Sequence, residues 1–331
     1  MGYKLAGYDV LGCNEIDKKM MAIYEANHHP KYSFLEGIQT FKDREDLPEE
    51  LYDLDVLDGS PPCSSFSMAG NREEDWGKEK IFREGQELQV LDTLFFDFID
   101  LAKRLQPKVV ISENVKGMLI GDAVDYVARI HQAFEEAGYK TIHMLLNAAD
   151  MGVPQRRERV FFISVRKDLA EKHMGGLFGD TLELYMDFNE QHIPFSQIED
   201  YELEEKDWRK ITPGFMEYYP LMQPGQTLSD VHPKGTGFQV YKLDPTRPLP
   251  TLRAGANDYM HPRDMRVLSK KEILRGSSFP MDFDFLKSQP IYVCGMSVPP
   301  VMMAQVASEV YRQILSKELI PSPITKLVKQ A

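Results

Sequence analysis

The sequence predicts an α/β protein in which a parallel sheet is flanked by helices and joined to a smaller domain. Short apolar runs alternate with helical patterns over the first half of the 331 residues, which is typical of βαβ units. The hydrophobic content is 43% and the charged content 27%, as in globular proteins. After about residue 167, Gly, Pro and charged residues become frequent, which indicates a loop-rich domain.

Local patterns predict the individual elements. We expect strands over 9–13, 53–58, 108–112, 139–146 and 160–165. We expect helices over 18–27, 87–105, 122–137 and 301–315. Leu and Phe recur at helical spacing within 87–105, and Pro107 ends that pattern. Pro300 is typical of the first turn of the last helix.

The composition argues against several classes of protein. We find no apolar run near the roughly 18–20 residues of a membrane span and no apolar core of a signal peptide. Cysteines at 13, 63 and 294 fit neither a disulfide framework nor a metal site, so we expect a cytoplasmic protein without a metal. The net charge is −12, yet residues 231–271 hold 8 Lys/Arg against 3 Asp/Glu. That segment is compatible with an ordinary solvated surface or with a phosphate-binding face.

Reactive side chains follow three predicted strands, at the edge where open α/β sheets collect function. Glu15 ends the first strand, Cys63 follows the second, and Glu113 ends the third. Cys63 lies in a stiff, polar Pro-Pro-Cys-Ser-Ser turn and is compatible with a reactive thiolate or a buried structural cysteine. Glu113 is compatible with a general acid or with a helix cap.

A basic motif, Gln155-Arg156-Arg157-Glu158-Arg159, precedes the strand 160–165. Alternation along an extended chain would place Gln155, Arg157 and Arg159 on one face. The motif is compatible with a charged strand edge or with a guanidinium pair that binds an anion or a polarised carbonyl.

Together these segments resemble the DNA (cytosine-5) methyltransferase family over nearly the whole chain. Each motif alone is a weak signal, but the ordered set is highly specific. The matching segments are Asn14-Glu15-Ile16-Asp17, Pro61-Pro62-Cys63-Ser64-Ser65-Phe66-Ser67, Thr93-Leu94-Phe95-Phe96-Asp97, Glu113-Asn114-Val115, the basic motif, 247–253 and Gly295-Met296-Ser297-Val298-Pro299.

The resemblance implies a Rossmann-like S-adenosylmethionine-dependent methyltransferase sheet with a smaller loop-rich target-recognition domain. The catalytic domain would comprise 1–166 plus 290–331, and the target-recognition domain 167–289. The implied reaction is methylation at C5 of a cytosine flipped out of double-stranded DNA.

The resemblance also assigns roles to residues. Cys63 would add to C6 of the base, Glu113 would hold or supply the proton at N3, and Arg157 and Arg159 would contact the base. Glu15 would bind the ribose hydroxyls of S-adenosylmethionine and Ile16 would pack on its adenine. The other implied cofactor contacts are Ile38, Pro62, Leu94 and Ser297.

The chain departs from the family pattern around the cofactor. The family's first strand and Gly-rich loop have no counterpart before Asn14-Glu15-Ile16-Asp17, Gly37 stands where an acidic residue is expected, and Met296 replaces an Asn. Three explanations are open: a truncated or misassigned gene start, a separate chain that supplies the strand, or an inactive homologue.

Other functions compete with DNA methylation. One alternative is a non-catalytic DNA-binding homologue. A less favoured one is a tRNA cytosine-C5 methyltransferase, which usually has Gln-Pro where this chain has Ser64-Ser65. A cognate restriction endonuclease is an expected partner if the chain belongs to a restriction-modification system.

Overall fold

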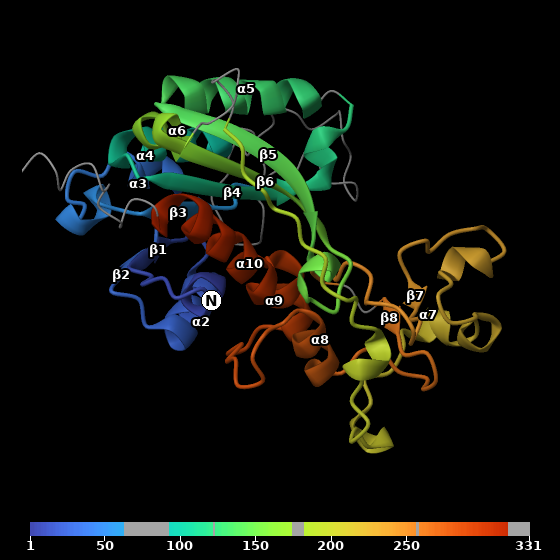
Figure 1. Cartoon of the computed structure of the whole chain (residues 1–331). Helices are drawn as coiled ribbons and strands as arrows, with labels where there is room; N and C mark the ends of the chain where they lie inside the picture. Colours follow the sequence, from blue (N-terminus) through green and yellow to red (C-terminus); the bar gives the residue numbers. More distant parts are fainter. Residues whose placement is uncertain (63–92, 122, 174–181, 256–257, 317–331) are drawn as a thin grey trace, which may run out of the picture. The chain divides into compact units, whose positions relative to one another are not determined.

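The computed structural model describes residues 1–62, 93–121, 123–173, 182–255 and 258–316 (Figure 1). The chain divides into two compact units. The loop-rich unit comprises Met1–Asp9, Asn147–Arg157 and Asp187–Ala307, and the sheet unit comprises Val10–Leu146, Glu158–Met186 and Ser308–Ala331. These boundaries differ from the expected domains 1–166 plus 290–331 and 167–289, so the target-recognition assignment stays a prediction.

The sheet unit contains a four-stranded sheet in the order β3-β4-β6-β5 and a separate parallel pair, β1-β2. β3 and β4 are parallel, whereas β6 runs antiparallel to β4. The α/β class is confirmed, but a wholly parallel sheet is wrong, because a strand buried on both faces has the same apolar run in either direction. The strand bounds are β1 Gly12–Asn14, β2 Tyr32–Phe34, β3 Val56–Gly59, β4 Val109–Val115, β5 Tyr139–Asn147 and β6 Glu158–Arg166.

The helices of the sheet unit begin close to where the sequence predicts them. α2 begins after Asp17, whose carboxylate accepts hydrogen bonds from the backbone N–H groups of Lys19 and Met20. The described part of the predicted helix 87–105 is α4. The bounds are α2 Lys18–His28, α3 Ile38–Phe41, α4 Leu94–Leu105, α5 Ala123–Glu136 and α6 Lys167–His173.

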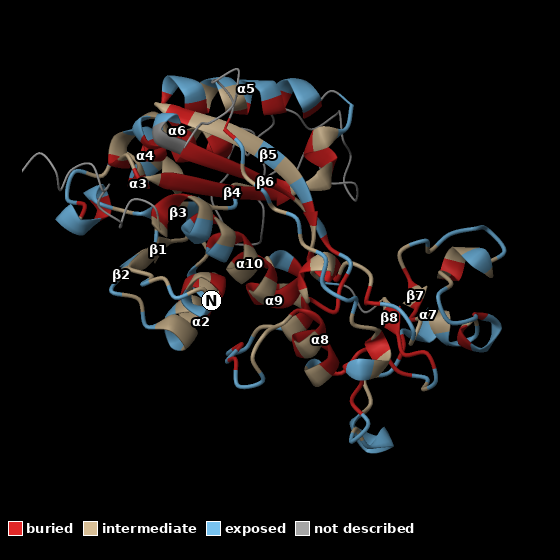
Figure 2. Cartoon of the chain, in the orientation of Figure 1, coloured by how far each residue is buried: buried red, intermediate tan, exposed pale blue. Residues whose placement is uncertain are grey.

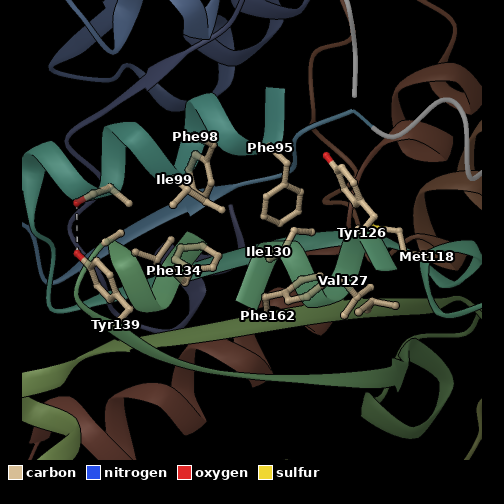
Figure 3. Close-up of a cluster of buried hydrophobic side chains, with 14 of the residues drawn as sticks. Phe95, Phe98, Ile99, Met118, Tyr126, Val127, Ile130, Phe134, Tyr139 and Phe162 are labelled. Atoms are coloured by element: carbon tan, nitrogen blue, oxygen red, sulfur yellow. Dashed lines mark hydrogen bonds between the residues drawn. The ribbon is translucent and has the colours of Figure 1, made fainter. Parts of the chain in front are cut away.

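The core of the sheet unit forms where α4 and α5 pack against β4 and β6 (Figure 3). Phe95 of α4 makes an edge-to-face contact with Phe162 of β6 at a centroid separation of 5.5 Å. Ile130 and Phe134 of α5 are completely buried. Figure 2 shows β4 and β6 buried along most of their lengths, so the strand that carries Glu113 is held rigidly.

The loop-rich unit has short elements and a second apolar cluster that includes Tyr219, Met222, Leu228 and Met260. Its strands β7 and β8 pair in parallel over two residues. α10 begins in this unit and continues into Ser308 of the sheet unit. The bounds are α1 Gly2–Leu5, α7 Pro213–Met216, β7 Tyr241–Lys242, β8 Tyr259–Met260, α8 Lys270–Gly276, α9 Pro290–Met296 and α10 Pro300–Val310.

One stretch among the described residues, Pro290–Leu315, has the length and hydropathy of a membrane-spanning helix. Its most apolar window has a mean hydropathy of 1.3, but 56% of that window is buried inside the protein. Val306 and Val310 are completely buried, so core packing accounts for their apolar character.

Gly59 ends β3 at a point where α4 leaves no room for a side chain. An ideal Cβ there would lie 2.4 Å from Cε2 of Phe98. We therefore expect Gly59→Ala to lower the free energy of unfolding by about 1–3 kcal/mol through overpacking, as measured by urea denaturation.

Two further variants check the cause of that loss. Gly214→Ala is the matched control, because nothing lies within 4 Å of an added Cβ there. Phe98→Leu should remove part of the clash, so the double variant should be more stable than the two single losses predict. Strict additivity would contradict the proposed contact.

Candidate active site

A carboxylate and a guanidinium meet across the antiparallel pair of β4 and β6. Val115 lies opposite Arg159 in this register, and Glu113 lies two residues from Val115 on the same face of β4. This diagonal spacing is within reach of a long side chain. Arg159 Nε lies 2.8 Å from Glu113 Oε1, and only 14% and 11% of the two side chains are exposed. The structure thus brings together two predicted catalytic residues.

The burial of Arg159 has an electrostatic cost that Glu113 offsets. Burial lowers the pKa of the Arg159 guanidinium from its usual value, and the charge and hydrogen bond of Glu113 oppose that shift. Arg159 also donates from Nη1 to the Glu158 carbonyl oxygen over 2.8 Å. The guanidinium is therefore fixed at two of its nitrogens.

Asn114 links this pair to the segment that leads to Cys63. Its Nδ2 donates to the carbonyl oxygen of Pro61 over 3.0 Å, and its Oδ1 accepts from the Val115 backbone N–H at 2.8 Å. Pro62 is the last described residue before Cys63, which itself lies outside the described residues. The nucleophilic role of Cys63 therefore stays a prediction.

The two described cysteines are poor candidates for a nucleophile. Burial raises the pKa of Cys13 to about 11 and that of Cys294 to about 12, so both thiols stay protonated at neutral pH. Among the residues that the structure describes, His, Cys, Asp and Glu form no group of three or more that could hold a metal ion.

Two predicted cofactor residues, Glu15 and Ile16, follow the carboxyl end of β1. The Glu15 backbone N–H donates to the Phe34 carbonyl oxygen over 3.0 Å, and Glu15 Oε1 accepts from the Asp17 backbone N–H at 2.8 Å. Ile16 lies beside Gly37, where an added Cβ would come within 3.6 Å of Ile16 Cδ1. A carboxylate beside an apolar wall suits a ribose and an adenine ring, so these residues fit the adenosine part of the cofactor.

Glu36, the acidic residue next to Gly37, already has two partners within the sheet unit. Its Oε1 lies 2.7 Å from Arg44 Nη1, and its carbonyl oxygen accepts from Asn14 Nδ2 at 2.8 Å. These contacts commit Glu36 to holding the chain between β2 and α3.

The other predicted cofactor residues lie in three different settings. Ile38 begins α3, Pro62 follows β3, and both are half-buried. Leu94 begins α4 and is buried. Ser297 follows α9 in the loop-rich unit, and its hydroxyl donates to the Val293 carbonyl oxygen over 2.7 Å. Their roles in cofactor binding stay predictions.

Arg157 has a different environment from the one that the resemblance implies. It is 2% exposed, and its guanidinium donates to the carbonyl oxygens of Leu252 and Gly295, each over 3.0 Å. These contacts favour a structural role over a base contact, because a guanidinium that binds two buried carbonyls cannot also reach a base without losing them.

Gln155, like Arg157, binds the backbone of Leu252. Its Oε1 accepts from the Leu252 backbone N–H at 3.1 Å, and its Nε2 donates to the Gly276 carbonyl oxygen over 3.0 Å. Burial alternates over 155–159 as predicted, with Gln155, Arg157 and Arg159 shielded and the two residues between them exposed, although β6 begins only at Glu158. Gln155 and Arg157 precede β6 and are anchored within the loop-rich unit.

Comparison with known proteins agrees with the motif order. The family model described as C-5 cytosine-specific DNA methylase matches residues 1–312. The type II methyltransferase M.NgoPII of Neisseria gonorrhoeae is 30% identical over 334 residues, which cover 95% of this chain and 92% of that protein. M.FnuDI of Fusobacterium nucleatum is 40% identical over 173 residues, 51% of this chain and only 44% of the relative.

Solved structures show the same fold at low sequence identity. A putative DNA modification methyltransferase encoded within an Escherichia coli prophage matches with a TM-score of 0.64 at 20% identity, over 95% of each chain. The Dnmt2 methyltransferase of S. pombe matches with a TM-score of 0.59 at 13% identity, over 94% of each chain. The extent of the family match and the M.NgoPII alignment establish that the chain belongs to the C-5 cytosine-specific DNA methylase family.

Proposed function

We propose that this chain transfers a methyl group from S-adenosylmethionine to C5 of a cytosine flipped out of double-stranded DNA, with Cys63 as the nucleophile. The observation that supports this most directly is the buried Glu113–Arg159 pair. Asn114, the neighbour of Glu113, binds Pro61, two residues before Cys63. A thiol, a carboxyl group and a guanidinium are the three groups that this reaction needs.

The chemistry assigns one task to each group. The Cys63 thiolate forms a bond to C6, which breaks the aromaticity of the ring and makes C5 nucleophilic. The Glu113 carboxyl group holds the proton at N3 that neutralises the developing charge. Arg159 positions Glu113 and stabilises the adduct. After methylation, a base removes the C5 proton, and elimination breaks the bond between C6 and sulfur.

S-adenosylmethionine supplies the methyl group from its sulfonium centre. Glu15 would accept hydrogen bonds from the ribose hydroxyls, and Ile16 would pack against the adenine. The other cofactor contacts that we propose are Ile38, Pro62, Leu94 and Ser297.

We also propose that a separate chain supplies one more strand to the sheet unit. β1 pairs with β2 and β3 with β4, but no described strand pairs with both β1 and β3. Leu11, next to β1, and Leu57 of β3 pack against one cluster with Leu101 and Leu105 of α4. β1 and β3 are only partly buried, whereas parallel strands are normally covered on both faces. A parallel strand between β1 and β3 would extend the apolar cluster to which Leu11 and Leu57 contribute.

The type II names of M.NgoPII and M.FnuDI favour a restriction-modification setting with a cognate endonuclease. In that setting the chain would protect DNA sites that the endonuclease cuts.

Replacement of the nucleophile tests the proposed mechanism. We expect Cys63→Ser to lower methylation of duplex DNA by at least about a thousandfold, because a hydroxyl is a far weaker nucleophile. The same variant should fail to form a covalent adduct with duplex that carries 5-fluorocytosine. Cys13→Ser is the matched control and should keep both activities. Full methylation by Cys63→Ser would contradict the assignment, and activity on tRNA alone would favour the tRNA alternative.

The role of Glu113 in proton exchange predicts an effect of its substitution on kcat. Glu113→Gln removes the group that exchanges the N3 proton, so we expect kcat to fall by about 10²–10⁴-fold, with the Kd for the cofactor unchanged. Lys116→Gln is the matched control, because Lys116 directly follows β4 and pairs with Glu158 of β6 at 2.8 Å, but both side chains are well exposed. If both variants reduce kcat equally, Glu113 has no special role.

The additional strand predicts a change in cofactor affinity. Adding the family's first strand and Gly-rich loop in trans, as a separate peptide of about 10–20 residues, should tighten the Kd for S-adenosylmethionine by at least about tenfold, or about 1.4 kcal/mol. Isothermal titration of the chain with and without the peptide makes this comparison. An unchanged Kd would contradict the proposal.

A further inference from the structure

Arg156 is an exposed residue between two buried ones. Gln155 is 1% exposed and Arg157 2%, whereas the structure leaves Arg156 open to solvent. The side chains of both neighbours are engaged inside the loop-rich unit, as described above. The middle of the basic motif therefore presents a single guanidinium outward.

The backbone of Arg156 is fixed independently of its side chain. Its N–H donates to the Leu249 carbonyl oxygen over 2.8 Å, and its carbonyl oxygen accepts from Thr251 Oγ1 at 2.8 Å. Gln155 also pairs with Leu249 in a parallel bridge. Substitution at Arg156 should therefore leave the local fold intact.

Most cations of the basic segment 231–271 are already committed to partners within the loop-rich unit. Arg253 binds Asp258 at 2.6 Å, Arg266 binds Glu272 at 2.8 Å, and Lys271 binds Glu202 at 3.2 Å. Arg263 pairs with Glu199. Lys242 is buried, and its Nζ donates to the carbonyl oxygens of Tyr219 and Met222. Most of the positive charges of segment 231–271 are therefore paired or buried within the loop-rich unit.

Arg156 differs from the four paired cations and from the buried Lys242, because it is exposed and forms no ion pair with any residue that the structure describes. Because its backbone is already fixed, Arg156 loses only side-chain entropy when it binds an anion, and its planar fork matches the oxygens of a phosphate. Arg156 is three residues before Arg159 in the sequence, so their Cα atoms are at most about 11 Å apart.

We infer that Arg156 binds a backbone phosphate of the DNA duplex and thereby positions the strand that carries the target cytosine. The inference rests on the proposed function, because it takes duplex DNA as the substrate. It adds a substrate contact at a residue with no assigned role in the proposed catalytic chemistry.

The test is the salt dependence of DNA binding by the full chain. One phosphate contact contributes about 0.9 to the slope of log K against log [salt] for duplex DNA. With a fluorescent 30-base-pair duplex of random sequence as the probe, Arg156→Gln should therefore reduce the slope by about one, and Arg156→Lys should restore most of it. Arg312→Gln is the matched control for net charge, because Arg312 is 65% exposed but already pairs with Glu309.

The outcomes separate the inference from the function it rests on. A slope that changes in Arg156→Gln but not in Arg312→Gln supports the contact. Equal slopes for wild type and Arg156→Gln overturn it and leave the proposed methyltransferase standing. Wild-type chain that binds no duplex overturns the proposed substrate itself. Thermal unfolding of each variant should match wild type, and a lower Tm for Arg156→Gln would overturn the premise that the backbone alone fixes this residue.

Discussion

The register between β4 and β6 is the constraint on which the candidate site depends. With Val115 opposite Arg159, the Glu113 carboxylate meets the guanidinium on the same face of the sheet. A shift of one residue would turn Arg159 to the other face, and the buried carboxylate would lose its partner. The register is in turn fixed by completely buried side chains along both strands, such as Ile111 and Ile163. The packing that buries these side chains therefore also fixes the geometry of the Glu113–Arg159 pair.

The sequence predicted most elements of the sheet unit because their apolar runs are long and their helices amphipathic. It misplaced the end of β4, which continues through Glu113 and Asn114 to Val115, because polar residues inside a strand look like a strand end. The role of Asn114 depends on the Pro61 carbonyl. No local pattern predicts a contact with a residue so distant in the sequence.

The basic motif shows a second limit of sequence patterns. Burial alternates over 155–159 as period two predicts, but the pattern does not show what the shielded side chains contact. The chain reaches β6 only at Glu158, and the side chains of Gln155 and Arg157 bind backbone groups of Leu252. Residues that alternate in sequence can therefore have unlike roles: Arg157 stabilises the loop-rich unit, and Arg159 faces a carboxylate. The order of motifs identified the family correctly because motif order does not depend on where each side chain points.

The number of Lys and Arg residues in a sequence does not show how many of them are paired with carboxylates in the folded protein. The segment 231–271 looked basic, yet Arg253, Arg263 and Arg266 each meet a carboxylate, and a cation that is already paired gains less from a phosphate. An acidic protein can bind DNA if a few cations remain unpaired at fixed positions, since phosphate contacts act locally and salt screens distant charges. The net charge of −12 is therefore a weak argument against DNA binding.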